Sequence, residues 1–558
     1  MSKRTLICLL SLLPMLGGSG FSQAAPREAS GSHKTGEGVA ATRTSSAHTP
    51  RRAGEATRSS ASATRLPPTT TGTTKRAQNT RVTGDGGGIS HRGIGWYRGD
   101  LHFHSNYSDD ALEQGGDWVG PALRIAEYYE DPVFQATFTE YVDNHLDFVA
   151  LTDHRTVEGT YDLDFRSEKL ILIPGEEFGS TGHAGALNIS SVVLHDPVEG
   201  RTPNEQIQWA IDNTKAQGGL FSINHPAGDD DLWFWDVSGY ESAEVWNMWV
   251  SLAGQPTSEA VLDGHVANYG VENRFIRRAM REEGKGIHGQ YRAFYEAHLV
   301  AGVPLAAVGG GDRHMLVLPG HPTTYVQAAE PSSDGLIEGI RARKTFVSRS
   351  PAGPQVLLGA KLNGVSYEVG ARIPAGATVT VTARVARANR GLLRIISGPI
   401  IRGVTRDQLL DMYPLGDVIF EVPIAGNDFS WQGNFVPSGE SWFYAEVLES
   451  ADYSDLPPDV VKDLDSLTAA MQSYGMRYPL LAYSLLPFMD PKTLAWPLLC
   501  KSSDWDVNRT ACVDVDDAFM GTIHISEPVD RILNLYREDN QLTEYALGAV
   551  SSAITVEL

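Results

Sequence analysis

The stretch GDLHFHSNYSDD, residues 99–110, places two histidines, His102 and His104, two positions apart. In a β-strand, residues i and i+2 point to the same face, so an H-x-H pair on a strand aims two imidazoles at one point in space. This is the spacing of metal ligands. An isolated pair could equally be a surface feature of an edge strand, so the rest of the chain has to decide between the two interpretations.

The N-terminal part of the chain has the composition of an export signal followed by a linker. Lys3 and Arg4 precede an apolar stretch at residues 6–13 and the small-residue segment FSQAA at 21–25, which predicts a signal peptide over residues 1–25. Residues 26–94 are rich in Ser, Thr, Ala, Gly and Arg, and such a segment buries too little apolar surface to offset its ordering entropy. We therefore expect a periplasmic or secreted protein with a disordered linker over residues 26–94.

Charge and cysteine content narrow the expected partners. The 558-residue chain has a formal net charge of −22, although residues 26–94 carry 11 Lys and Arg against 4 Asp and Glu, so the remainder is strongly acidic. An acidic body argues against nucleic acid or an anionic membrane as a partner. Outside the signal, no segment is long and apolar enough to span a membrane. In an oxidising compartment we expect Cys500 and Cys512 to form a local disulfide, with two free buried thiols as the alternative.

Short apolar runs alternate with helical patterns between residues 95 and 350. The runs are LDFVAL (146–151), LILIP (170–174), GLFSI (219–223), AEVWNMW (243–249) and PLAAV (304–308). This rhythm predicts buried parallel strands and crossover helices, and so a closed or nearly closed α/β barrel over residues 95–350. Alternating patterns such as ATVTVTARVARA (377–388) then predict an antiparallel sheet or small sandwich, so that residues 351–558 form a β-rich C-terminal domain with the Cys500–Cys512 loop.

Side chains of metal-ligand type follow almost every run. In an α/β barrel the chemistry lies at the C-terminal ends of the strands. TDH follows LDFVAL, GEEFGSTGHAG follows LILIP, NHP follows GLFSI, GGGDRH follows PLAAV, and AEVWNMW itself contains Glu244 and Asn247. So many candidate ligands at corresponding strand ends predict a multi-metal site that begins with His102 and His104.

The ordered motifs DLHFHSNYSD, TDH, PGEE, GHAGALN, NHP and GGDRH resemble those of the polymerase and histidinol phosphatase (PHP) superfamily of metal-dependent hydrolases. The run TTYVQAAEPSSDGLIEGIRARKTFVSRSPAGP (323–354) and the β-rich tail are similar to its carbaryl-hydrolase branch, the CehA/McbA-like proteins. The resemblance covers roughly residues 95–446. It implies a distorted (β/α)7 barrel that binds two or three metal ions.

The resemblance also implies the metal ligands, which are His102, His104, Asp109, His154, Glu177, His183, His225, Asp312 and His314. Glu177 would bridge two metals, with Glu176 as the alternative, and His195 could serve in place of His183. The candidate catalytic residues are Glu177, Asp312 and Arg313, although Arg313 could instead form a structural salt bridge. The remaining histidines follow no strand end and are expected to be structural: His145, His265, His288, His298 and His321.

Histidine and carboxylate ligands without cysteine suit Zn²⁺, Mn²⁺ or Fe and fit poorly with a Mg²⁺-only site. Two or three such ions would turn water into a hydroxide nucleophile for attack on a small-molecule ester. We expect a phosphoesterase, because clustered divalent cations suit an anionic transition state.

Two other functions stay open. The branch resemblance makes carbamate or aryl carboxyl ester hydrolysis the alternative. Trp233, Phe234 and Trp235 could then form an aryl-binding wall, although large rings more often belong to a core or a lid. A non-catalytic metal-binding envelope protein is the second alternative. The sequence leaves the substrate, the identity and number of the metals, and the oligomeric state open.

Overall fold

The computed structural model describes residues 95–108, 118–127, 146–179, 182–195, 198–228, 232–248, 256–282, 286–313, 319–375, 378–450 and 545–557. The predicted signal peptide and linker lie outside these residues, and so do Asp109, His145, His314, Cys500 and Cys512. Within the described ranges, no helix has both the length and the apolar character needed to cross a membrane.

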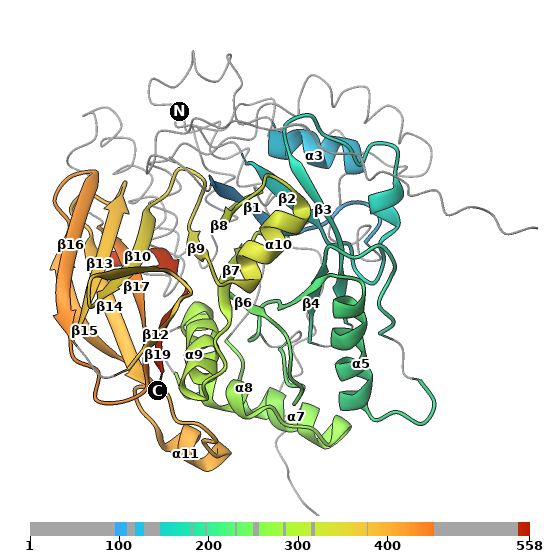
Figure 1. Ribbon diagram of the computed structural model, residues 1–558. Helices are drawn as coiled ribbons and strands as arrows, with labels where there is room; N and C mark the ends of the chain where they lie inside the picture. Colours follow the sequence, from blue (N-terminus) through green and yellow to red (C-terminus); the bar gives the residue numbers. More distant parts are fainter. Residues whose placement is uncertain are drawn as a thin grey trace, which may run out of the picture. The chain divides into compact units, whose positions relative to one another are not determined.

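The first seven strands neighbour one another in chain order within a large sheet (Figure 1). They are β1 (Gly95–Phe103), β2 (Phe148–Leu151), β3 (Ile171–Phe178), β4 (Ala184–Leu187), β5 (Leu220–Ile223), β6 (Ser242–Asn247) and β7 (Ala306–Gly310). Just after β7, Arg313 forms a parallel bridge with Phe103, and its carbonyl accepts the His104 N–H at 2.9 Å. The carboxyl ends of β1 and β7 therefore meet, although they are far apart in the sequence.

Most of these strands pair in parallel, as the sequence predicts. Parallel pairing joins β1 to β2, β2 to β3, β5 to β6 and β6 to β7, whereas β4 is antiparallel to both β3 and β5. Strand β4 is not among the runs predicted from the sequence, and it is antiparallel because residues 179–183 are too few to make the crossover that a parallel pair needs. Every residue of β2, β4, β5, β6 and β7 is buried, which explains their uninterrupted apolar runs.

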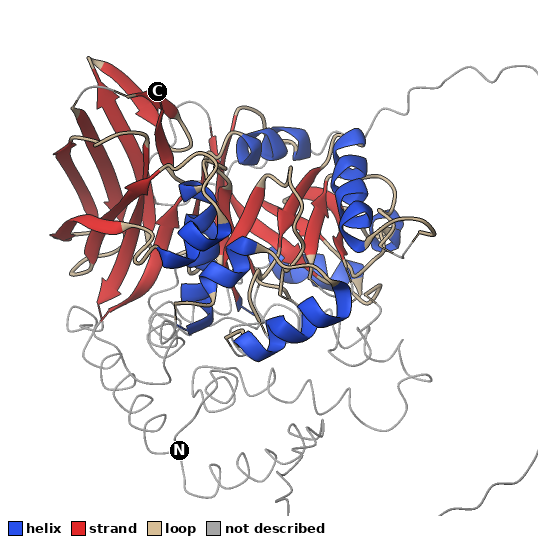
Figure 2. Cartoon of the chain, turned by 90° about the horizontal axis from the view of Figure 1, so that it is seen from below, coloured by secondary structure: helices blue, strands red, loops and turns tan. Residues whose placement is uncertain are grey.

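Helices lie against these strands (Figure 2). They are α3 (Val119–Glu127), the 3₁₀ helix η1 (Glu158–Tyr161), α5 (Pro203–Ala216), α7 (Glu259–Tyr269), α8 (Arg274–Ala279) and α9 (Gly286–Val300). Helix α5 begins with a capping box, in which Thr202 and Glu205 each accept the other's backbone N–H. Buried side chains of α5, α7, α8 and α9 share one core cluster with β5 and β6.

The large sheet continues past the predicted boundary at residue 350. Strands β8 (Thr323–Ala328) and β9 (Thr345–Ser348) flank α10 (Ser333–Arg341), and β8 is antiparallel to β1 and to β9. Strand β9 then pairs with β18 (Tyr545–Ser551), from the end of the chain. Beyond β18 the sheet contains β12 (Arg372–Pro374), β14 (Leu392–Pro399), β15 (Asp417–Pro423), β17 (Ser441–Ser450) and β19 (Ile554–Glu557), with α11 (Arg406–Asp411) between β14 and β15.

A second sheet has four antiparallel strands, in the order β11 (Val365–Glu368), β10 (Gln355–Leu362), β13 (Val379–Ala386) and β16 (Asp428–Phe435). The pattern of β13 alternates as predicted, with Val379, Val381, Ala383 and Val385 buried. These side chains share a core cluster with those of β14, β17, β18 and β19. The described part of the chain after residue 350 is thus rich in β-strands, with two sheets around one core.

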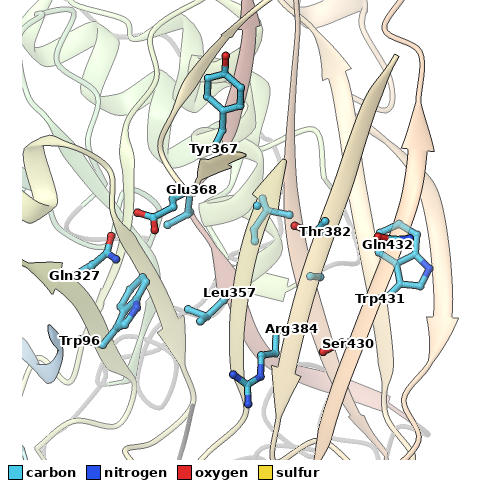
Figure 3. A pocket seen from close by; sticks show the side chains of 14 residues that line it. Trp96, Gln327, Leu357, Tyr367, Glu368, Thr382, Arg384, Ser430, Trp431 and Gln432 are labelled. Carbon is cyan, nitrogen blue, oxygen red and sulfur yellow. The ribbon is translucent and has the colours of Figure 1, made fainter. Parts of the chain in front are cut away.

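A groove of about 530 Å³ borders the four-stranded sheet (Figure 3). Trp96 and Gln327 line it together with Leu357, Thr382 and Arg384. None of the described candidate metal ligands is among its lining residues. The described candidate ligands lie at or near the strand ends instead.

Candidate metal centre

Five histidines and two carboxylates converge at the ends of the strands. His102 and His104 come from β1, His154 follows β2, Glu177 lies in β3, His183 precedes β4, His225 follows β5 and Asp312 follows β7. His102, His104 and Glu177 are fully buried, and Asp312, His225 and His183 are at most 9% exposed. The H-x-H pair of the sequence is therefore part of a buried cluster.

Glu177 is at the centre of the cluster. Its Oε1 lies 3.0 Å from His102 Nε2, 3.1 Å from His225 Nε2 and 3.4 Å from His183 Nδ1. Its Oε2 lies 3.1 Å from His154 Nδ1 and 3.4 Å from His104 Nε2. The carboxylate divides its two oxygens between two groups of histidines, as a ligand that bridges two metal ions would.

Asp312 joins the same cluster from the opposite end of the strand order. Its Oδ1 lies 3.3 Å from both His102 Nε2 and His104 Nε2, and its Oδ2 lies 3.8 Å from His225 Nε2. A Cβ at Gly310 would come within 2.3 Å of the His102 Cβ, so only glycine lets the two strands approach so closely. This accounts for a glycine of the GGGD motif.

The donor set fits divalent metal ions. One ligand atom each from His102, His104, Glu177 and Asp312 lies within 4.8 Å of the others, and the same holds for His154, Glu177 and His183. Imidazole nitrogens combined with carboxylate oxygens suit Zn²⁺, Mn²⁺ or Fe. The buried groups could thus hold metal ions in two sub-sites that share Glu177.

The electrostatics of the cluster favour cations. Burial alone would raise the pKa of Glu177, but His102, His183 and His154 hold that pKa well below its usual range. Burial alone would lower the pKa of His102, but Asp312, Glu177 and Glu244 hold it well above its usual value. The Glu177 carboxylate is therefore ionised and needs a positive charge beside it, which protons on the imidazoles or divalent cations can provide.

The structure separates the two glutamates between which the sequence left a choice. Strand β3 extends to Phe178, so both lie inside the strand and not in a loop after it, and neighbours in a strand point to opposite faces. Glu177 faces the histidines, whereas Glu176 Oε1 accepts the Val193 N–H at 2.6 Å. Burial raises the pKa of Glu176 to about 8, so this carboxyl is mostly protonated at pH 7.

Other predicted site residues lie elsewhere. His195 contacts the edge of Phe178 with ring centroids 6.5 Å apart, while His183 is the histidine beside Glu177. The guanidinium of Arg313 lies over the ring of Phe103, 5.1 Å from its centroid. Because Phe103 alternates with His102 and His104 along β1, this contact is on the opposite face from the cluster. Asp109 and His314 are outside the described residues.

The aromatic run and the remaining histidines belong to packing. Trp233 and Phe234 are fully buried, Trp235 is 5% exposed, and all three are part of a core cluster. His265 stacks on Phe234. Three more histidines that were predicted to be structural form hydrogen bonds within the protein. His288 bonds to the Asn247 carbonyl, His298 to the Tyr240 hydroxyl and the Phe294 carbonyl, and His321 to the Pro319 carbonyl.

Several supporting residues were not predicted as site residues. Asn224 donates to Glu177 Oε1 at 2.9 Å. The Ser108 hydroxyl lies 2.8 Å from His104 Nδ1 and donates to Asp153 at 3.1 Å.

Asp100 holds β1 against the segment that follows β7. Its carboxylate accepts the backbone N–H groups of His102, Gly311 and Gly320. Each of these supporting residues is within four residues of a predicted ligand, which is the only signal that the sequence offers.

Comparisons with known proteins add little to this geometry. No protein-family model and no curated protein matches the chain. Among solved structures it is similar to a two-domain protein from Bacteroides vulgatus ATCC 8482 that contains a predicted PHP-like metal-dependent phosphoesterase. The two share 15% sequence identity, with a TM-score of 0.28, over 66% of this chain and 94% of that chain. A TM-score this low supports no conclusion about this chain, so the functional assignment rests on the buried cluster.

Proposed function

We propose that this protein is a metal-dependent hydrolase of the PHP superfamily that cleaves phosphate esters. One observation carries the proposal: the buried Glu177 carboxylate contacts five histidines from four separate regions of the chain, with its two oxygens divided between them. Structural packing rarely buries so many ionisable groups together, because each costs desolvation free energy unless a charge compensates it. A centre of two or three divalent ions provides that compensation.

The chain's own residues have distinct roles in this proposal. His102, His104 and Asp312 would hold one ion and His154 and His183 another, with Glu177 shared between them. Asp109 and His314, which the PHP resemblance adds, would complete the ligand set. His225 lies between Glu177 and Asp312 and would serve either ion. Bound divalent ions would activate a water molecule and neutralise negative charge on the ester.

Phosphate esters are the preferred substrate class because clustered cations stabilise an anionic transition state best. The burial of Trp233, Phe234 and Trp235 in the core argues against their use as an aryl-binding wall, which weakens the case for a carbamate or aryl carboxyl ester hydrolase. All seven described members of the predicted ligand set are present in one cluster, which weighs against a decayed, non-catalytic metal-binding protein. In this proposal the scaffold is a distorted seven-stranded barrel, and the protein is exported to the periplasm or the medium.

The test is metal analysis of the purified protein followed by assays on four esters: p-nitrophenyl phosphate, bis-p-nitrophenyl phosphate, 1-naphthyl acetate and carbaryl. We expect bound Zn, Mn or Fe, and hydrolysis of one or both phosphate esters that stops after chelation and returns when Zn²⁺ or Mn²⁺ is added. Hydrolysis of only the carboxyl ester or the carbamate would favour the alternative enzyme. Bound metal without turnover of any ester would indicate a binding protein.

A further inference from the structure

Glu244 of β6 lies directly behind the cluster without joining its ligands. Its side chain is buried, and its Oε1 lies 3.0 Å from His102 Nδ1. The other nitrogen of the same ring, Nε2, lies 3.0 Å from Glu177 and 3.3 Å from Asp312. The His102 ring is thus held between one carboxylate outside the cluster and two inside it.

The second oxygen of Glu244 is also fully engaged. Oε2 accepts the backbone N–H of His225 at 2.7 Å and the side-chain amide of Asn247 at 2.9 Å. The same Asn247 amide nitrogen lies 3.4 Å from Asp312 Oδ2. One carboxylate therefore connects ligands that come from β1, from the end of β5 and, through Asn247, from the segment after β7.

From these contacts we infer that Glu244 is a positioning residue that fixes His102 as the Nδ1–H tautomer and so reserves Nε2 for a metal ion. A carboxylate whose other oxygen already accepts two N–H groups acts as an acceptor towards His102 as well, so the His102 nitrogen that faces it has to carry the proton. The remaining ring nitrogen then has a free lone pair directed at the cluster. This inference deepens the proposed function and rests on its metal centre.

Gly310 leaves space for the Glu244 carboxylate. A Cβ at Gly310 would lie 2.6 Å from Glu244 Oε1, so a larger residue there would displace it. The Nδ1 of His104, by contrast, faces the Ser108 hydroxyl and not Glu244. Replacing Glu244 should therefore affect the sub-site of His102 first.

The substitution Glu244→Gln tests the tautomer directly. The amide has nearly the shape of the carboxylate but offers an acceptor on one side only. Since His225 N–H and Asn247 together present two donors to Oε2, the amide oxygen is expected to face them and the amide NH₂ to face His102 Nδ1. His102 would then have to accept at Nδ1 and carry its proton on Nε2, where the proton blocks metal binding.

We expect E244Q to raise the dissociation constant for Zn²⁺ about 10- to 100-fold at one sub-site, measured by competition with a chromogenic chelator, while the other sub-site stays filled. The matched control is E176Q, which makes the same change in another buried glutamate, and an amide oxygen there can still accept the Val193 N–H. E176Q should bind zinc as the wild type does. A merely structural role for Glu244 would lower the melting temperature without this selective loss.

A second measurement uses the wild-type protein and does not depend on E244Q. In zinc-loaded wild-type protein labelled with ¹⁵N-histidine, the His102 signals, assigned by their loss in H102Q, should show a protonated Nδ1 and a coordinated Nε2. The opposite assignment, or equal zinc affinity of E244Q and wild type, would overturn the inference and leave the proposed function intact. A wild-type protein that binds no zinc, manganese or iron at all would instead remove the proposed function and this inference with it.

Discussion

Glu176 and Glu177 show how one step along a strand changes the chemistry of a carboxyl group. Both are fully buried in β3, but Glu177 faces five histidines, whereas Glu176 accepts the backbone N–H of Val193. The histidines keep Glu177 ionised, and burial without a compensating charge raises the pKa of Glu176 to about 8. The two residues therefore form a natural pair of test and control.

Glu177→Gln should remove most of the bound metal and reduce ester hydrolysis by at least about 100-fold, because an amide cannot bridge two cations as a carboxylate does. Glu176→Gln should retain metal and activity, since the neutral amide replaces a carboxyl that is already mostly neutral. Metal content by mass spectrometry and turnover of bis-p-nitrophenyl phosphate distinguish the two variants. Equal losses in both would mean that damage to β3, and not loss of a bridging ligand, explains the effect.

At the scale of the elements, the site depends on the meeting of β1 with the segment that follows β7. The Phe103–Arg313 bridge and the Asp100 contacts to Gly311 and Gly320 bring His102 and Asp312 to 3.3 Å. Asp312 has a φ of 50°, a left-handed conformation that Asp and Asn adopt more readily than other non-glycine residues. Because asparagine also adopts this left-handed conformation readily, Asp312→Asn should leave the backbone unchanged.

H102Q and D312N should therefore each lower the metal content and the hydrolysis rate by orders of magnitude, with only a small change in melting temperature. The control is H265Q, because the ring of His265 stacks on Phe234, which belongs to a core cluster. Metal content, turnover and thermal unfolding are measured on all three. Full metal and full turnover in D312N would show that Asp312 is not a ligand, and Glu177 would then be the one carboxylate ligand left among the described residues of the cluster.

Local motifs at strand ends account for what could be predicted from the sequence. H-x-H, TDH, NHP and GGGD each combine a buried strand with a polar side chain in a few residues, and their members meet in the structure. The antiparallel β4 and the position of Glu177 inside β3 could not be read in this way, because strand direction and strand length depend on pairing with β5 and β2. Glu244 was noted only as a possible ligand, because its contact with His102 exists only after β6 and β1 approach each other.

For the molecule as a whole, the strands near the end of the chain connect the metal-site region to the β-rich region. Strand β18 pairs with β9 on one side and β17 on the other. Just beyond it, Ser552 Oγ accepts the Ala307 N–H of β7 at 2.9 Å, and Ala553 N–H donates to the Tyr295 hydroxyl of α9 at 2.9 Å. Residues 545–557 are thus part of the support of the strand that precedes Asp312.

Deletion of residues 545–558 should therefore destabilise the metal-site region as well as the β-rich region. Removing β18 leaves the ladder groups of β9 and β17 without partners and exposes apolar side chains such as Val550 and Ile554, which are fully buried. We expect a single unfolding transition at a markedly lower temperature, or an insoluble product. A deletion variant with unchanged melting temperature and metal content would show that the two regions are stable independently.

An acidic pair, the half-buried Glu296 and the buried Glu446, also connects α9 with β17, and it makes stability depend on pH. The Tyr444 hydroxyl donates to Glu296 at 2.6 Å and lies 3.4 Å from Glu446, which in turn pairs with Arg292 at 3.3 Å. Burial raises the pKa of Glu296 from 4.5 to about 7, with Glu446 and Glu282 adding to the rise while Tyr444 and Arg292 oppose it. The protonated form of Glu296 is thus the one that the fold prefers.

Because the folded pKa of Glu296 is the higher one, its contribution to stability is fully present below about pH 4.5 and is lost as the pH rises through about 7. Glu296→Gln keeps an acceptor for the Tyr444 hydroxyl and removes the ionisation. The melting temperatures of wild type and E296Q should therefore be similar at pH 5, and that of the wild type should fall below that of E296Q between pH 6 and 8. Melting curves of metal-free protein measure this without interference from the metal site, and parallel curves for the two proteins would show that Glu296 is ionised in the fold at pH 5 already.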